Sequence, residues 1–111
     1  MLLRHATPRK NQPSIDELGL LCSKSQGRRK VVWLHTRNKS AWAAIHSVRR
    51  HGGRVENVVV LEVCVPRRWL RRSKRGLWYC LFDVPPGRIC GRITFAALAR
   101  SPVDDGAPLA C

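Results

Sequence analysis

The apolar run at residues 57–65, Asn-Val-Val-Val-Leu-Glu-Val-Cys-Val, constrains the fold of this chain more than any other segment. It is rich in β-branched residues, which favour a strand, and it is much shorter than the roughly 20 residues that a membrane-spanning helix needs. Gly52 and Gly53 precede the run and Pro66 follows it, so both ends carry residues that interrupt regular structure. The run therefore predicts one central strand that is buried on both faces.

Three further segments predict strands of the same sheet. Residues 30–36 and 77–82 combine β-branched and aromatic side chains, and residues 89–95 form a similar run that Gly91 interrupts. Together with the central run they predict a small mixed or antiparallel sheet of about four strands. With two or three short helices between the strands, the expected fold class is α+β.

Helical spacing is clearest in the segment that begins at Ser40. Four apolar residues recur there at helical intervals and predict the buried face of a helix: Ala41, Ala44, Ile45 and Val48. Pro66 suits the first turn of a helix, so residues 67–72 predict a second, shorter one. Residues 14–21 predict a third short helix, because Ser14 is followed three residues later by Glu17 in a capping pattern.

The two ends of the chain differ from the segments between them. Residues 1–29 have weak periodicity and contain Pro8 and Pro13, so they predict a basic, loosely structured N-terminal arm. Residues 101–111 contain two prolines and an Asp-Asp-Gly sequence, which predict a flexible tail. The α+β domain is therefore expected at residues 30–100.

The chain is strongly basic, which bears on its partners. It has 21 Lys and Arg against 7 Asp and Glu, a formal net charge of +14 over 111 residues. Such an excess favours polyanionic partners, meaning nucleic acid or an anionic membrane surface, although a solvated arginine-rich surface is the plainer interpretation. Six cations stand close together without an acidic neighbour and favour an anion-binding face: Arg67, Arg68, Arg71, Arg72, Lys74 and Arg75. Trp69 among them either stacks on a base or anchors the core.

The cysteines and histidines bear on location and metal binding. The five cysteines include no C-x-x-C pair, and Cys64 and Cys80 lie in apolar strands, a pattern that favours a reducing compartment. No secretory leader or apolar span is recognisable, so a cytoplasmic location without a membrane partner is expected. His46 and His51 have no His or Cys partners at metal-ligand spacing, so no metal site is expected.

Four short motifs follow one another in a recognisable order. They are Arg50-His51-Gly52, the apolar residues 59–63, Gly76-Leu77-Trp78 and Val84-Pro85-Pro86. This series resembles the C-terminal half of the RNA 2′-phosphotransferase family, which has the ADP-ribosyltransferase fold. The resemblance implies a half-ADP-ribosyltransferase-like sheet. The family's N-terminal half has no counterpart here, and Leu3-Arg4-His5 echoes its first motif without the residues that follow it there.

The resemblance implies NAD-dependent transfer at a phosphate of nucleic acid, with RNA preferred to DNA. It places a phosphate-binding arginine at Arg50, since a guanidinium stays charged and binds phosphate through two N–H groups. In an alternative register His35 is catalytic and contacts NAD, with Thr36 and Trp78 beside the cofactor. The plainer interpretations are that Arg50 is a helix C-terminal cation and that His35 is a packed core histidine.

Three functions are therefore carried forward from the sequence. The first is a reduced relative of the NAD-dependent 2′-phosphotransferases or ADP-ribosyltransferases, which requires His35, Thr36 and Arg50 to converge on one cleft. The second is a non-enzymatic module that binds RNA or DNA through residues 67–75. The third is a small accessory domain that a protein partner completes. Glu62 is expected to pair with an arginine, because a carboxylate in a buried run needs one.

Overall fold

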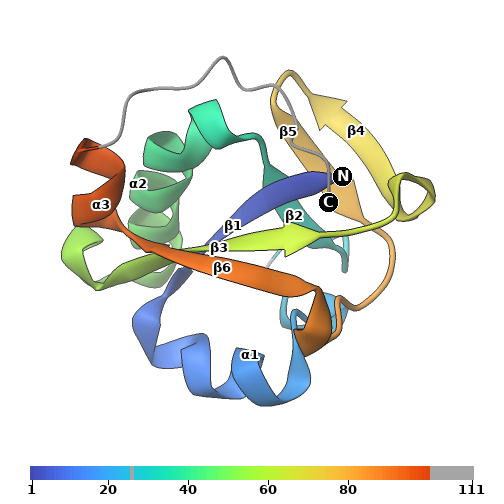
Figure 1. Ribbon diagram of the computed structural model, residues 1–111, viewed down its shortest axis with the longest axis horizontal. Helices are drawn as coiled ribbons and strands as arrows, with labels where there is room; N and C mark the ends of the chain where they lie inside the picture. The colour runs from blue at the N-terminus through green and yellow to red at the C-terminus, as the bar shows by residue number, and fades with distance from the viewer. Residues whose placement is uncertain (26, 101–111) are drawn as a thin grey trace.

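The computed structural model describes residues 1–25 and 27–100, which form one antiparallel sheet flanked by helices (Figure 1). The strands of the described ranges are β1 (Leu2–Pro8), β2 (Val32–His35), β3 (Val58–Cys64), β4 (Leu70–Lys74), β5 (Leu77–Cys80) and β6 (Ile89–Thr94). They lie in the order β4-β5-β2-β1-β3-β6. The predicted α+β class is confirmed, with a six-stranded antiparallel sheet where about four strands were expected.

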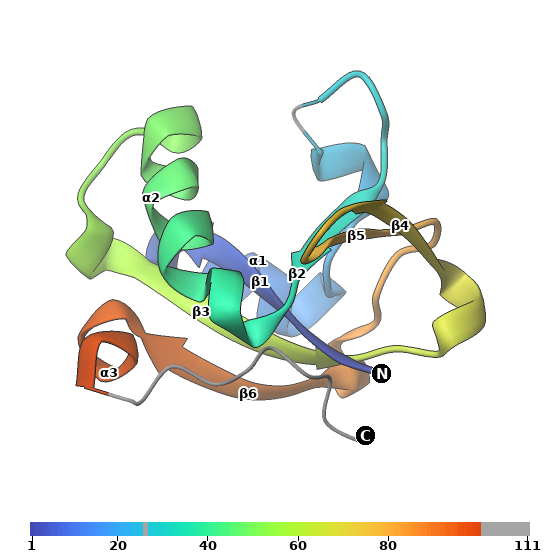
Figure 2. The same ribbon diagram turned by 90° about the horizontal axis from the view of Figure 1, so that it is seen from above.

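Helices cover both faces of this sheet. α2 (Ser40–His51) packs on β1 and β3 and also contacts α3 (Phe95–Arg100), so these two helices share one face (Figure 2). α1 (Gln12–Leu18) covers the other face, where its buried Ile15 joins the main hydrophobic core. The predicted tail at residues 101–111 lies outside the described residues. Within the described ranges, no helix combines the length and apolar character needed to cross a membrane.

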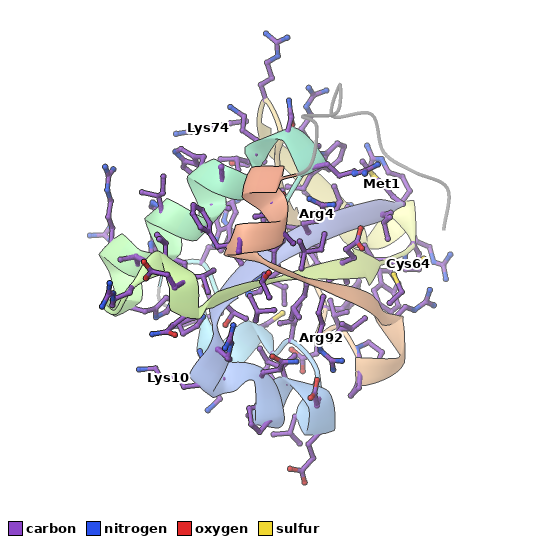
Figure 3. The ribbon with its side chains drawn as sticks, turned by 60° about the vertical axis from the view of Figure 1, so that its left-hand side comes forward. Met1, Arg4, Lys10, Cys64, Lys74 and Arg92 are labelled. Atoms are coloured by element: carbon purple, nitrogen blue, oxygen red, sulfur yellow. The ribbon has the colours of Figure 1, made fainter. Side chains whose placement is uncertain are left out.

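The N-terminal segment departs most from the sequence prediction. Residues 2–8 are not a loose arm: β1 lies between β2 and β3, and it pairs with β3 from Leu2↔Cys64 to Pro8↔Val58. Figure 3 shows Met1 and Cys64 at the same end of the sheet, and the Met1 amine donates to the Val65 carbonyl at 2.9 Å. β1 lacks apolar alternation and is held by strand pairing, which is why periodicity did not reveal it.

The central apolar run behaves as predicted. β3 lies inside the sheet, and Val58 to Leu61 and Val63 are all buried. Towards α1, Leu3 and Leu61 pack in one cluster with Leu34 and Ile15. The loop before β6 is tied to this core, because Leu20 and Val84 exchange backbone hydrogen bonds of 2.9 and 2.8 Å.

α2 is confirmed as a helix, but its predicted buried face is wrong in part. The residues that it buries are Ser40, Ala43, Ala44 and Ser47. Ala44 was expected there, whereas Ala41 is exposed and Ile45 keeps 43% of its surface accessible. The sheet beneath α2 carries the buried Arg4 side chain, which donates to Ser40 Oγ at 3.0 Å. A polar neighbour and close packing favour small side chains on this face of the helix.

The helix predicted at residues 67–72 is also wrong. Pro66 has extended backbone (φ −60°, ψ 137°), a single 3₁₀ turn spans Arg67–Trp69, and the chain then enters β4. Leu70 pairs with Cys80 of β5, so the basic segment is the edge hairpin of the sheet. The two strands turn at Gly76, whose φ of 76° is readily adopted by glycine.

Candidate nucleic-acid interface

The residues predicted to form one catalytic cleft lie at different places. His35 ends β2 and is 4% exposed, and Thr36 follows it just before α2. Arg50 lies near the other end of α2 and is exposed. A helix rises about 1.5 Å per residue, so the ten residues from Ser40 to Arg50 span roughly 15 Å. The structure therefore does not bring Arg50 together with His35 and Thr36.

Trp78, the third residue predicted at the cofactor, faces the opposite side of the sheet from His35. His35 pairs with Leu77, and successive residues of a strand point to opposite faces. Trp78 is buried in the core on the α1 side. The guanidinium groups of Arg67 and Arg72 lie over its ring at 4.8 and 5.8 Å from the centroid. A single cofactor site cannot include both Trp78 and His35.

The surroundings of His35 suit a packed histidine better than a catalytic one. Burial, followed by the electrostatic effects of His5 and Arg4, lowers the pKa of His35 to about 3. The ring is therefore neutral at neutral pH and is a weak base. Its Nε2 atom is buried and has no hydrogen-bond partner among the described residues. The Thr36 hydroxyl is engaged locally, since it donates to Asn38 Oδ1 at 2.6 Å.

An aromatic pair, in which Trp33 is exposed and Tyr79 half-buried, lies on the α2 side of the sheet. Trp33 of β2 and Tyr79 of β5 are directly opposed, with ring centroids 5.4 Å apart and planes inclined at 59°. Trp33 keeps 37% of its surface accessible, so part of its ring is open to a ligand. The Arg29 guanidinium lies 4.8 Å from the centroid of the Tyr79 ring. We call these three residues the aromatic face.

One flank of α2 faces the same side as this pair. Lys39 packs against the β4–β5 turn, because a Cβ on Gly76 would lie 2.9 Å from Lys39 Cγ. His46 and Arg50 follow Lys39 by about two and three helical turns and share its flank. Partial burial and the charges of Arg50 and Arg49 lower the pKa of His46, whose neutral Nε2 accepts a 3.2 Å hydrogen bond from Arg50 Nε. Arg50 is exposed on this flank.

The six cations predicted to bind nucleic acid are all exposed at the β4 edge. They are nevertheless divided between the two faces. Arg67 and Arg72 lie over Trp78 on the α1 side, whereas Arg71 pairs with Tyr79 on the α2 side and donates to the Leu70 carbonyl at 2.9 Å. Lys74 and Arg75 stand at the turn of the hairpin, and Arg68 lies in the 3₁₀ turn before β4. The cations form an edge that borders both faces.

Sequence reasoning did not select Trp33, Tyr79 or Arg29. The signal was alternation: Trp33 stands between Val32 and Leu34, which are both buried, so its side chain points to the other face. Trp78 and Tyr79 are neighbours on β5 and point to opposite faces, and the choice of Trp78 for a cofactor site took the buried member of the pair. Which face is open is decided by where α2 packs, and strand alternation alone does not show this.

β1 and β2 separate next to the aromatic face. Within the described residues their register holds one pair, Arg4↔His35, after which β1 continues along β3 and β2 along β5. His5 Nδ1 lies 2.7 Å from the Trp33 carbonyl, so the His5 ring bridges the two strands. A carbonyl only accepts, so Nδ1 carries the hydrogen. Burial lowers the pKa of His5, which this hydrogen bond partly offsets, and His51 lowers it further.

Neither a metal site nor a known relative indicates the function of this protein. Among the residues that the structure describes, no three side chains of the metal-ligating types form a group. A scan against protein-family models and a search of curated proteins both find no match for the chain. Function is therefore inferred from the arrangement of the residues.

Proposed function

We propose that this protein binds single-stranded RNA across the aromatic face. The observation that carries this proposal is the accessible Trp33 ring beside Tyr79 and Arg29, in a chain of net charge +14. Aromatic rings on a sheet offer stacking platforms for unpaired bases, and surrounding cations bind the phosphates. A duplex keeps its bases stacked on one another, so a single strand is the form that fits such a platform.

Different residues make the base-stacking contact and the phosphate contacts. A base stacks on the open side of Trp33, while Arg50 on the flank of α2 binds a phosphate of the same strand. Lys74 and Arg75 at the hairpin turn extend the positive edge. Arg67 and Arg72 already lie over Trp78 on the other side of the sheet, so we expect them to contribute less.

The experiment is a binding titration of a fluorescent oligouridine, followed by anisotropy over a range of salt concentrations. Trp33→Ala should weaken binding about tenfold, the loss of one stacked base, with little change in salt dependence. Lys74→Ala should instead reduce the salt slope by about one. Phe82→Ala is the matched control, because Phe82 is also an exposed aromatic residue, at 53% accessibility, but packs edge-on against Trp69. Equal losses for Trp33→Ala and Phe82→Ala, or binding that does not respond to salt, would refute the proposal.

A second candidate is NAD-dependent transfer, which the family resemblance implies. The observation that favours it is the 2.7 Å contact of His5 Nδ1 with the Trp33 backbone carbonyl, where β1 and β2 separate. His5 belongs to the Leu3-Arg4-His5 sequence that echoes the family's first motif, and its neutral ring keeps Nε2 as an acceptor for a ribose hydroxyl. His35, the histidine first expected there, is buried.

This candidate is tested by incubating the protein with NAD and 2′-phosphorylated RNA and measuring release of the phosphate. Turnover that His5→Ala abolishes, and that Arg50→Ala lowers, would establish the transferase. Absence of turnover in the wild type, together with no effect of NAD on the His5 ring resonances, would exclude it. RNA binding by the aromatic face would stand in either case.

We also place the protein in the cytoplasm. This proposal rests on the sequence pattern of cysteines without a C-x-x-C pair. In the structure Cys22, Cys80 and Cys90 are free thiols, whereas Cys64 is disulfide-bonded, so the expectation that Cys64 is a reduced, buried thiol is wrong. Fractionation of cells that express a tagged full-length chain, with recovery in the soluble cytoplasmic fraction, is the result expected.

A further inference from the structure

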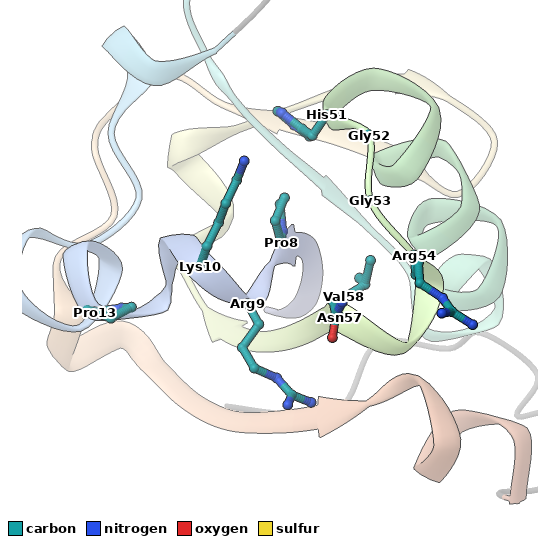
Figure 4. Close-up of a pocket in the computed structure, with 10 residues that line it drawn as sticks. All are labelled: Pro8, Arg9, Lys10, Pro13, His51, Gly52, Gly53, Arg54, Asn57 and Val58. Atoms are coloured by element: carbon teal, nitrogen blue, oxygen red, sulfur yellow. The ribbon is translucent and has the colours of Figure 1, made fainter.

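A pocket lies where the end of β1 meets the end of α2 (Figure 4). Its volume is about 430 Å³, within the range of small-molecule sites. Pro8, Pro13 and Val58 supply apolar walls, and Gly52 and Gly53 form the rim after α2. A Cβ on either glycine would meet nothing within 4 Å, so this rim borders open space.

The charged side chains that line the pocket are all basic. Figure 4 shows the Lys10 amine and the His51 ring extending to the same side of the pocket, whereas Arg9 and Arg54 point away from it. Arg54 Nε instead pairs with Glu56 Oε2 at 3.3 Å. Partial burial and then the charge of Lys10 lower the pKa of His51.

We propose that this pocket binds a phosphomonoester dianion between the Lys10 amine and the His51 ring. Both groups can donate to phosphate oxygens, and the apolar walls can cover the group that the phosphate carries. The carbonyl end of α2 adds partial negative charge here, so the side chains have to supply the attraction. The same phosphate group occurs on a free nucleotide and at a phosphorylated RNA end; the second source rests on the proposed RNA binding.

Among the described residues, the charged groups that act on His51 oppose its protonation. Lys10 faces it from the 3₁₀ turn Arg9–Asn11, His46 and Arg50 from α2, and His5 from β1. A bound dianion reverses this balance, so it should raise the pKa of His51. By linkage, the affinity for an anion of fixed charge should increase as the pH falls through the titration of His51.

The first experiment follows backbone amides and histidine ring protons of the full chain by NMR during titration with sulfate, whose charge stays constant over the range, and then with inorganic phosphate. We expect saturable shifts at Gly52 and Gly53, a raised His51 pKa, and affinity three- to tenfold lower in Lys10→Ala, about one charge-assisted hydrogen bond. His51→Asn should remove the pH dependence of sulfate binding. Lys24→Ala, which removes an exposed lysine outside the pocket, is the control, and thermal melts check that each variant folds. Equal losses in Lys10→Ala and Lys24→Ala, or shifts that do not saturate, would overturn the site.

The second experiment separates the sources of the phosphate. Adenosine monophosphate binding at least tenfold tighter than inorganic phosphate would identify a free nucleotide. A 5′-phosphorylated oligouridine that outbinds its 5′-hydroxyl form, with the advantage lost in Lys10→Ala but kept in Trp33→Ala, would identify an RNA end. If neither exceeds inorganic phosphate, the pocket holds an adventitious ion only, and the proposal fails without affecting RNA binding by the aromatic face.

Discussion

Arg4 and Glu62 form an ion pair across β1 and β3, with Arg4 Nη2 3.5 Å from Glu62 Oε2. The two residues are directly opposed in the strand register, and His35 of β2 opposes Arg4 on its other side. A second Arg4 nitrogen donates to Ser40 Oγ at the start of α2. The 7% exposed Arg4 therefore joins three strands to the helix that covers them. This pairing confirms the expectation that Glu62 meets an arginine.

Removing the Glu62 charge should destabilise the fold markedly. Glu62→Gln leaves a nearly buried guanidinium without its counter-charge, and we expect a loss of about 2–3 kcal/mol in the free energy of unfolding, somewhat below a fully buried pair because Glu62 is 25% exposed. Glu56→Gln is the control: the Arg54–Glu56 pair is 80% and 64% exposed, so the change should stay within about 0.5 kcal/mol. Urea unfolding at neutral pH measures both. Equal effects would show that burial of the Arg4 pair contributes nothing.

Gly91 leaves the room that Glu62 occupies. A Cβ on Gly91 would lie 2.6 Å from Glu62 Oε1, so Gly91→Ala must displace this carboxylate from Arg4. We expect a cost of about 1–2 kcal/mol, measured by urea unfolding. Most of that cost should vanish in the Glu62→Ala background, and Gly87→Ala, where a Cβ meets nothing within 4 Å, should be nearly neutral. Additive losses in the double variant would contradict this coupling.

The ion pair also explains why β1 was not predicted from the sequence although the other central strands were. β3 and α2 were recognised because long periodic runs are local signals, and β2, β5 and β6 because β-branched and aromatic residues cluster in them. β1 was missed because Arg4 and His5 stand where apolar residues would mark a strand. Arg4 is tolerated there because it forms an ion pair with Glu62 and donates a hydrogen bond to Ser40. Those partners lie 58 and 36 residues away in the chain. A local sequence pattern does not show that residues far along the chain will supply partners for a buried charge.

The candidate site likewise combines features that local sequence predicts with features that depend on distant parts of the chain. The cations of residues 67–75 were correctly placed on the surface, although on a hairpin and not on a helix. Trp33 was available from alternation but was not selected, because its exposure depends on where α2 packs: the helix lies over β1 and β3, and Trp33 of β2 stays accessible. The predicted convergence of Arg50 with His35 and Thr36 is wrong for a geometric reason: Arg50 lies near the far end of the twelve-residue helix α2, whose first residue is close to Thr36 in the chain.

Two glycines with similar backbone angles should respond very differently to alanine. Gly19 and Gly53 have φ values of 81° and 85°, so each substitution carries the strain of a left-handed residue, about 1–2 kcal/mol. At Gly19 a Cβ would also lie 2.0 Å from the Val84 carbonyl oxygen, a backbone atom held by the Leu20–Val84 bridge. We expect Gly19→Ala to cost at least about 3 kcal/mol and Gly53→Ala to cost about 1 kcal/mol in urea unfolding. Similar losses at both positions would show that the close approach to Val84 relaxes freely.

His35 should make the stability of the fold depend on pH. Its pKa is lowered from 6.5 to about 3 in the folded protein, so between these values the unfolded chain binds more protons. The stabilisation is fully present above pH 6.5 and is lost as the pH falls towards the folded pKa, at up to about 1.4 kcal/mol per pH unit. His5, whose pKa is also lowered, acts in the same direction. Urea unfolding at intervals from neutral pH to about pH 4.5 measures the slope, which should be clearly flatter in His35→Phe.

The control for this prediction is His46→Gln, because only part of the His46 surface is buried. Its folded pKa is lowered as well, but the group is accessible to water, so its removal should change the slope much less than removal of His35. A slope in His35→Phe as steep as in the wild type would mean that the ring protonates without cost. Water would then have to reach the row of Glu62, Arg4 and His35 beneath α2, and the low accessibility of Arg4 and His35 argues against that.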